Sequence, residues 1–372
     1  MVTAAGDPAF IPLRERSAWS DVMSAAEHTD IYHTPEYHLL AEAHGEGDAT
    51  LFVYREGPAM AAWPLLLRRI DAVEELGEAG AGYHDATSVY GYPGPVWNIV
   101  ARTRPGFFPR FQCAFEQALR ERNVVCLFSR MHPIFGVTLL QGNSGALEHK
   151  GQTISIDLSR EVSQQTADYR ANHLSGIHRA GHLGYRAYLD ERKEHLDTFI
   201  CLYNRTMERA HAGPQYFFGR EYFTTLIDTL GPRVHLWVAG KGDEICSAAL
   251  FLHGGEVIQY HLGGSNKEGL DHALSKVVID EARKWGTSTG ARWLHLGGGR
   301  GAHEDSLFHF KAGFSHARHD FFLWKSILLP QVYERLVGAR AGHLAGTGRH
   351  VSDGSFFPLY RSEALAGGLT AS

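Results

Sequence analysis

A single lysine stands among aromatic residues in the string Ser306–Phe314, SLFHFKAGF, which follows the glycine-rich stretch Gly297–Gly301 at the end of a predicted strand. Ligands of α/β proteins commonly bind at the carboxyl ends of strands. Lys311, between Phe310 and Phe314, is therefore placed to hold an anion or the oxyanion that develops during acyl transfer. A solvated helix lysine whose stem passes its aromatic neighbours explains the string as well.

A second string, Tyr260–Asn266 (YHLGGSN), follows the predicted strand Val257–Gln259. Tyr260 is a candidate for orienting a substrate or relaying a proton, and Gly263–Gly264 would allow a backbone to approach a ligand closely. An edge-strand tyrosine followed by a plain turn is the competing interpretation.

A third string, Asp85–Pro95, places Tyr90 and Tyr92 among glycines and prolines. Such a loop is rigid, and its aromatic faces are suited to line a cleft. A purely structural loop is an equally good reading of this composition.

A predicted helix and the residues after it carry regularly spaced basic side chains, among them Arg170, Arg179 and Arg186. This spacing is suitable for holding phosphates, although a solvated charged face gives the same pattern. The formal net charge of -5 predicts no general attraction to nucleic acid, so any such binding depends on a local patch.

Several other kinds of chemistry lack their signatures. The glycine cluster does not match GxxxxGK[ST] or a GxGxxG motif after a first strand, and His303-Glu304-Asp305 is not HExxH. Since HExxH and the zinc spacings of His and Cys are missing, we expect no metal. Serine-triad and cysteine-protease strings are missing as well. The four cysteines form no CxxC pair, which favours free thiols. Without an apolar leader or a run of about 18 apolar residues, the chain is expected in the cytoplasm.

The elements that would position these residues occur twice along the chain. Hairpins are predicted at residues 51–70 and 234–253, helices at 107–121 and 272–285, and strands at 124–129 and 293–296. The repeat predicts a duplicated α/β domain with mixed sheets. We expect a first lobe at residues 1–150, a second lobe with the active site at 151–337, and a loosely ordered tail at 338–372.

The segment between the lobes opens with a predicted strand at residues 154–158. A helix is expected from Ser159 or Ser163 to about residue 180, and another at 193–210. The tail lacks periodicity apart from a possible strand at residues 356–360.

Taken together, these strings resemble the FemABX-like group of tandem GNAT proteins, including members with a BioF2-like acetyltransferase domain. The resemblance covers roughly residues 15–335 and is carried by Asp30–Tyr37, Tyr90–Pro95, Tyr203–Arg209 with Tyr216-Phe217, Tyr260–Ser265, and Phe310-Lys311. It implies two tandem GNAT-like domains that move an aminoacyl group from aminoacyl-tRNA to an amine, without a cofactor.

The resemblance also implies roles for individual residues. It assigns Lys311, Phe310 and Tyr260 to catalysis. It assigns substrate contacts to Tyr203, Arg205, Tyr216, Tyr90, Tyr92 and Ser265. If tRNA binds, Arg170, Arg179 and Arg186 are its expected contacts, because the long charged helical arm of some relatives is missing.

Three functions stay open at this stage. The segment Ser265–Asp271 is not the [QR]xxGx[GA] loop that cradles coenzyme A phosphates, which favours aminoacyl-tRNA over an acyl-CoA donor. A non-catalytic member that binds precursors is the third possibility. The proton acceptor is equally open among Asp305, His309, Tyr260 and the substrate itself.

Overall fold

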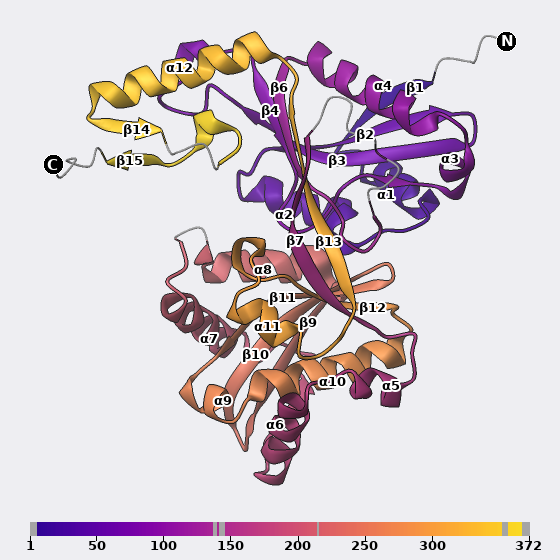
Figure 1. The fold of residues 1–372 in the computed structure, drawn as a ribbon, viewed down its shortest axis with the longest axis vertical. Coiled ribbons are helices and arrows are strands. Elements are labelled where there is room, and N and C mark those ends of the chain that lie inside the picture. Colours follow the sequence, from indigo (N-terminus) through magenta and orange to yellow (C-terminus); the bar gives the residue numbers. More distant parts are fainter. Residues whose placement is uncertain (1–5, 137–139, 141–145, 214–215, 352–355, 367–372) are drawn as a thin grey trace. The chain divides into compact units, whose positions relative to one another are not determined.

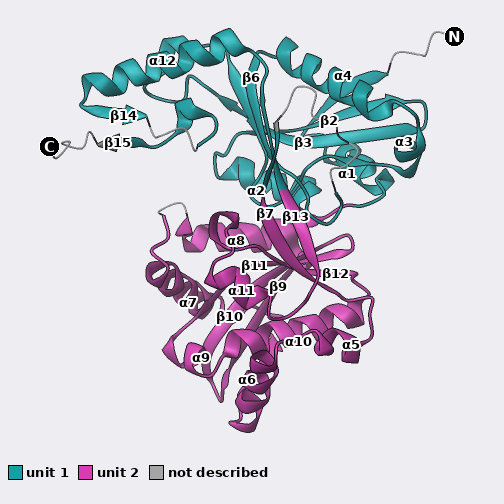
Figure 2. Ribbon diagram, in the orientation of Figure 1, with its two compact units in different colours: residues 1–28, 32–149, 322–372 teal, residues 29–31, 150–321 magenta. Residues whose placement is uncertain are grey.

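The computed structural model describes residues 6–136, 140, 146–213, 216–351 and 356–366. The chain forms two compact units, shown in teal and magenta in Figure 2. Unit 1 contains residues 1–28, 32–149 and 322–372, and unit 2 contains residues 29–31 and 150–321. Each unit is therefore assembled from segments that are distant in sequence, and β7 (Ala146–Asp157) and β13 (Arg318–Ile327) contribute residues to both.

Unit 1 is built on a mixed sheet with helices packed against it (Figure 1). The strand order is β1 (Asp7–Pro12), β2 (Asp48–Glu56), β3 (Ala59–Arg69), β4 (His84–Thr87), β6 (Val124–Arg130) and β13, with β5 (Val96–Trp97) paired to β3. Its helices include α1 (Arg16–Ala25), α2 (Pro35–Ala43), α3 (Ile99–Thr103), α4 (Phe107–Glu121) and α12 (Pro330–Gly346).

Helix α4 lies where the apolar spacing predicts it, because Phe107, Phe111, Phe115 and Leu119 form one buried stripe. That stripe packs against Phe52 and Trp63 of the β2–β3 hairpin; the Trp63 and Phe115 ring centroids are 4.7 Å apart.

Unit 2 is likewise built on a mixed sheet with helices. Its strands run β7, β12 (Trp293–Gly297), β11 (Val257–Ser265), β10 (Glu244–Gly254), β9 (Val234–Lys241) and β8 (Arg186–Leu189). Its helices are α5 (Val162–Ala167), α6 (Ala171–His182), α7 (Leu196–Arg209), α8 (Arg220–Leu230), α9 (Lys267–Asp271), α10 (Leu274–Thr289) and α11 (Ser306–Lys311). The predicted α/β class with two related halves is confirmed.

The helix expected from about residue 160 to 180 is interrupted at Arg170. This residue is extended, with ψ of 143°, and its N–H donates to the carbonyl of Gly313 at 2.9 Å. A partner 143 positions away therefore separates α5 from α6, which a local pattern does not reveal.

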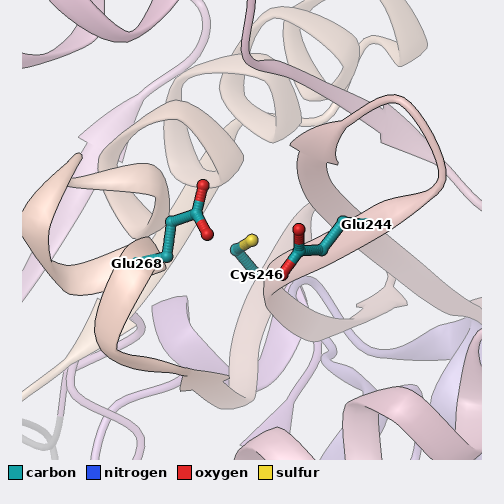
Figure 3. A group of neighbouring side chains, drawn as sticks. All are labelled: Glu244, Cys246 and Glu268. Atoms are coloured by element: carbon teal, nitrogen blue, oxygen red, sulfur yellow. The ribbon is translucent and has the colours of Figure 1, made fainter.

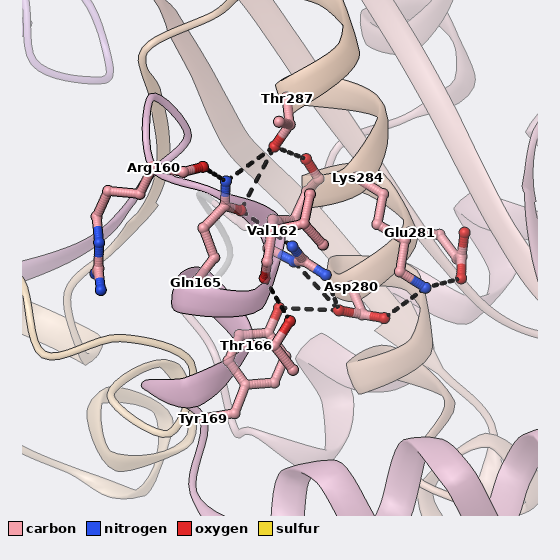
Figure 4. Close-up of polar contacts among 10 residues, drawn as sticks. Arg160, Val162, Gln165, Thr166, Tyr169, Asp280, Glu281, Lys284 and Thr287 are labelled. Atoms are coloured by element: carbon pink, nitrogen blue, oxygen red, sulfur yellow. Dashed lines mark hydrogen bonds and ion pairs between the residues drawn. The ribbon is translucent and has the colours of Figure 1, made fainter.

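A buried polar network then holds α5 against α10 (Figure 4). Arg283 is 1% exposed and donates to Gln165 and to Asp280, while Tyr169 donates to the same carboxylate at 3.1 Å. Because a buried charge without a partner is strongly destabilising, this network accounts for the buried positions of Arg283 and Asp280.

The chain after residue 337 differs from the loosely ordered tail that we expected. Helix α12 continues to Gly346, because Leu336 and Leu344 are buried, and β14 (Arg349–Val351) pairs with β15 (Ala364–Ala366). Residues 359–361 form a 3₁₀ turn in place of the expected strand at 356–360, where Pro358 has no N–H to donate to a strand partner.

Candidate active site

In unit 2, the parallel strands β11 and β12 are paired only over their first residues. The pairs run from Val257↔Trp293 to Gln259↔His295, although β11 continues to Ser265. Against β10, the register of β11 shifts so that His261 is the extra residue of a bulge. The far part of β11 is thus free of β12, as a ligand site at the carboxyl end of a sheet requires.

Lys311 reaches the end of β12 from α11. Its Nζ donates to the carbonyl oxygen of Gly298 at 2.7 Å and lies 5.9 Å from the centroid of the Tyr260 ring. The residue is only 8% exposed. Burial lowers the pKa of the amine to about 8, against an opposing contribution from the charge of Asp305. The site thus contains a desolvated cation beside the aromatic face of Tyr260.

The loop between β12 and α11 is tightly folded around Asp305. The Asp305 carboxylate caps α11 by accepting from the N–H of Phe308 at 3.0 Å, and it also accepts from Arg300 Nε at 2.9 Å. A side chain at Gly299 would lie 2.0 Å from the carbonyl oxygen of His303, so only glycine fits there. Arg300 in turn donates to the carbonyl of Ala210 just after α7. This fixes the approach of α11 to the strand ends.

Tyr260 is held between Phe251 and the glycines of β11. Its ring contacts Phe251 edge-on at 5.4 Å, and a Cβ at Gly263 would lie 2.1 Å from the Tyr260 hydroxyl. A Cβ at Gly264 would lie 2.4 Å from the Leu202 backbone. The two glycines therefore leave room for the Tyr260 side chain and for the backbone of α7. We had considered that they leave room for a ligand.

Among the other predicted residues of unit 2, Tyr203 and Ser265 are buried and structurally bonded. The Tyr203 hydroxyl donates to the Tyr216 carbonyl at 2.7 Å, and Ser265 exchanges a 2.8 Å hydrogen bond with Ser247. Arg205 and Tyr216 are exposed. Phe310 packs against Phe314 and accepts from His173 through its carbonyl, so its ring supports α11.

Tyr90 and Tyr92 belong to unit 1. Tyr90 is 40% exposed, with the Arg130 guanidinium 6.0 Å from its ring centroid. Tyr92 contacts Tyr32 edge-on at 6.2 Å, and Tyr32 packs so closely on Gly91 that a Cβ there would clash. The loop is thus held in place by the segment that follows residue 31.

The predicted phosphate-binding arginines are exposed and donate to backbone carbonyls. Arg170 donates to His309, Arg179 to Asp271, and Arg186 to Gly181. Two further cations lie beside them, although the sequence analysis did not single them out. The pKa of Lys276 is lowered by burial and by the charge of Arg179; the pKa of Arg318 is lowered by burial and by Arg170.

We call these five cations, with Lys241 beside Gly184, the α6 basic strip: Arg170, Arg179, Arg186, Lys241, Lys276 and Arg318. None of them lies in an ion pair with a carboxylate of the described residues. Helix α6 itself contains no acidic residue. Neighbouring cations repel one another, and an anion beside them would relieve that repulsion; Glu304 offsets it in part at Arg318.

The region around α9 is acidic instead. Glu244, Cys246 and Glu268 present ligand atoms within 4.8 Å of one another (Figure 3). Glu268 already accepts from the Tyr185 hydroxyl at 2.5 Å, and burial raises the pKa of the Cys246 thiol. A protonated thiol is a poor metal ligand, so we assign no metal to this group.

The proton-acceptor candidates differ in their surroundings. Burial would raise the pKa of Asp305, but hydrogen bonds from Arg300 and the Phe308 N–H lower it overall, which weakens this carboxylate as a base. Burial raises the pKa of Tyr260 to about 12, so its hydroxyl stays protonated near neutral pH. His309 is exposed.

Part of unit 2 matches a known protein family. Residues 167–311, wholly within unit 2, match the family described as "Acetyltransferase (GNAT) domain". A search of curated protein sequences gives no match.

Solved structures match over most of the chain. FemX is similar with a TM-score of 0.66 and 13% identity, covering 88% of this chain and 99% of FemX. L-PGS from Bacillus licheniformis has a TM-score of 0.52 and 13% identity, covering 87% and 96%. The C-terminal domain of a putative lysylphosphatidylglycerol synthetase from Agrobacterium fabrum gives 0.52 and 13%, covering 84% and 91%.

The chain thus has the GNAT fold, and its unit 2 contains a match to a GNAT acetyltransferase domain. More particularly, the chain has the fold of FemX, and the predicted resemblance to FemABX-like tandem GNAT proteins is confirmed. Within the described residues, no helix is both long enough and apolar enough to cross a membrane.

Proposed function

We propose that this protein is an N-aminoacyltransferase that moves an aminoacyl group from aminoacyl-tRNA to an amine of a cell-wall precursor or peptide-like natural product. The observation that carries the proposal is Lys311, a buried cation whose Nζ binds the Gly298 carbonyl just after β12, where β11 and β12 no longer pair. Its charge would stabilise the oxyanion formed when the amine attacks the ester carbonyl.

The reaction needs no covalent intermediate on the protein. The amine nitrogen forms a bond to the ester carbonyl carbon, the bond from that carbon to the ribose oxygen breaks, and the amine proton passes to the ribose oxygen, which leaves as a hydroxyl. Because the ester is already activated, positioning and charge stabilisation are the main tasks. We assign these to Lys311 and Tyr260, with Phe310 supporting α11.

The substrate contacts stay part of the proposal. In unit 2 we assign the acceptor side to Tyr203, Arg205, Tyr216 and Ser265, since Tyr203 and Ser265 order the α7 end beside β11. In unit 1, the exposed Tyr90 and the half-buried Tyr92 are proposed to contact substrate.

The charge distribution supports RNA over coenzyme A. Three carboxylates lie at the turn after β11: Glu268 and Asp271 on α9, and Glu244 near Cys246. They would repel the phosphates of an acyl-CoA at this turn. The α6 basic strip, in contrast, gathers cations from α6 and from the strands and helix beside it, which suits a sugar–phosphate backbone.

To test this, the protein is incubated with a mixture of aminoacylated tRNAs and candidate amine acceptors, and the product is detected by mass spectrometry. Product that disappears when RNase is added first supports the tRNA donor. Product that persists after RNase excludes it.

An acyl-CoA-dependent N-acyltransferase is the second candidate, because the family that matches unit 2 is described as an acetyltransferase. Saturating acetyl-CoA would then raise the melting temperature measurably, since a ligand that binds only the folded state stabilises it. A non-catalytic precursor-binding protein, the third possibility, would bind acceptors without product in either assay.

A further inference from the structure

A row of buried polar side chains crosses the unit 2 sheet at the level where β11 and β12 stop pairing. Gln259 and His295 are the last paired residues of these two strands, and His295 is also paired with Ser155 of β7. Asp30, Gln259 and His295 are at most 1% exposed. Polar groups buried in a sheet of otherwise apolar residues are retained only with hydrogen-bond partners, so their arrangement calls for an explanation.

The three side chains form a chain of hydrogen bonds in which each donor and acceptor is fixed. Gln259 Nε2 donates to Asp30 Oδ2 at 2.5 Å, and Gln259 Oε1 pairs with His295 Nδ1 at 2.7 Å. The other Asp30 oxygen accepts from the N–H of Ile31 at 2.5 Å. Since a carboxylate only accepts, the amide has a single satisfactory orientation, and His295 must carry its proton on Nδ1.

This row borders the candidate site on both strands. Tyr260 follows Gln259 directly, and the Gly298 carbonyl that binds Lys311 lies three residues after His295. The register of β12 against β7 also shifts immediately after His295. The hydrogen bond between Gln259 and His295 thus holds the two strands together at their last regular level.

Asp30 reaches this row from a segment that is distant in sequence. Residues 29–31 belong to unit 2, although residues 28 and 32 belong to unit 1. Gly254 and Gly255 at the β10–β11 turn leave room for this segment, because a Cβ on either would lie within 2.3 Å of the Thr29 or Ile31 backbone. The Asp30 carboxylate is therefore held against the sheet from both sides.

We propose that Asp30, Gln259 and His295 are positioning residues, which fix the point where β11 and β12 separate and thereby set Tyr260 and the Gly298 carbonyl for Lys311. The proposal rests on the proposed function for the site that it serves. Its test below does not need the donor to be known.

The direct test exchanges the positions of the carboxylate and the amide. Gln259→Glu faces Asp30 with a second carboxylate, and Asp30→Asn cannot accept from both Ile31 and Gln259. The double variant Asp30→Asn/Gln259→Glu restores every bond. In it, the new amide at position 30 donates to the new carboxylate at position 259 and its oxygen accepts from Ile31, while that carboxylate accepts from His295. We expect each single variant to be impaired and the double variant to be rescued.

The readout is the pKa of Lys311, measured by NMR on protein labelled with [13Cε]lysine, where Lys311→Met identifies the signal. The wild-type value should be about 8. In the single variants the Lys311 pKa should move toward its ordinary value of 10.5, and in the double variant it should return. If a transfer assay is available, kcat should fall about 100-fold with KM nearly unchanged, since the misplacement is at the reacting end.

Gln165→Met is the matched control. Gln165 is as buried as Gln259 and also bonds a charged side chain, Arg283, but it lies between α5 and α10 (Figure 4). This variant should lose stability and leave the Lys311 pKa at about 8. An unchanged Lys311 pKa in the folded Gln259→Glu and Asp30→Asn proteins would overturn the proposal.

If Gln259→Glu does not fold, the Lys311 pKa in Asp30→Asn and in the double variant tests the proposal instead. Both of these variants keep the size and polarity of the side chains. A double variant that folds but fails to restore the Lys311 pKa contradicts the proposal as well. If the pKa values behave as expected and no aminoacyl transfer is ever detected, the proposed function fails and the positioning role stands.

Discussion

The Nζ atom of Lys311 donates a 2.7 Å hydrogen bond to the carbonyl oxygen of Gly298. This contact joins the last residue of α11 to the glycine loop after β12, 13 positions earlier in the chain. It holds an almost fully buried ammonium group at the carboxyl end of β12.

Removal of the ammonium group should slow transfer strongly. We expect Lys311→Met to lower kcat by about 100- to 1,000-fold, the range for loss of one preorganised oxyanion donor, while the methionine keeps the apolar stem. Lys284→Met on α10 is the control, because Lys284 pairs with Asp280 and Glu281 away from the site. Activity of Lys311→Met at the wild-type rate would remove Lys311 from the mechanism.

The same substitution should change how stability depends on pH. The Lys311 pKa is about 8 in the folded protein and 10.5 ordinarily, so the unfolded chain binds more protons between these values. Stability contributed by this residue therefore rises as pH increases from about 8 to 10.5. At neutral pH Lys311→Met should be more stable than wild type by roughly 3 kcal/mol at most, and the advantage should disappear above the ordinary pKa. Urea unfolding at several pH values measures this, and a constant difference would contradict it.

The absence of a side chain at Gly263 should be needed for the observed position of the Tyr260 ring. A Cβ at this position would lie 2.1 Å from the Tyr260 hydroxyl and 3.4 Å from Ala249 Cβ. Gly263→Ala should therefore destabilise the protein by about 1–3 kcal/mol, as overpacking of a core does. Tyr260→Phe removes the clashing oxygen, so the double variant should recover part of that loss. Thermal unfolding of the four proteins gives the coupling energy, and strict additivity would argue against the contact.

Removal of a positive charge from the α6 basic strip should weaken the binding of tRNA that carries no amino acid. Lys276→Ala and Arg179→Ala should each lower affinity and reduce the slope of log K against log salt by about 1, as expected for one lost phosphate contact. Lys267→Ala is the control, because Lys267 already pairs with Asp271 at 2.6 Å. An identical salt slope in all three variants would place the RNA elsewhere.

Much of the fold follows from local pattern. The apolar spacing at residues 107–121 predicts α4 with its observed bounds, and the hairpin predicted at residues 234–253 is formed by β9 and β10. These elements form because one stripe or one face of each is apolar, which is a property of neighbouring residues. The interruption at Arg170 escapes such a pattern, because its cause is the carbonyl of Gly313.

The sequence by itself determined which residues could do chemistry: a lysine among phenylalanines, a tyrosine at a strand end and a basic helix. The tertiary structure decided their surroundings. It brought Gly298 to Lys311, added Lys276 and Arg318 to the basic strip, and joined Asp30 to Gln259 and His295. A polar glutamine and histidine within the apolar strands 257–259 and 293–296 were the only sequence signal of that last set. Hydrogen bonds between distant segments depend on where whole elements pack, so the periodicity of residues within one element does not encode them.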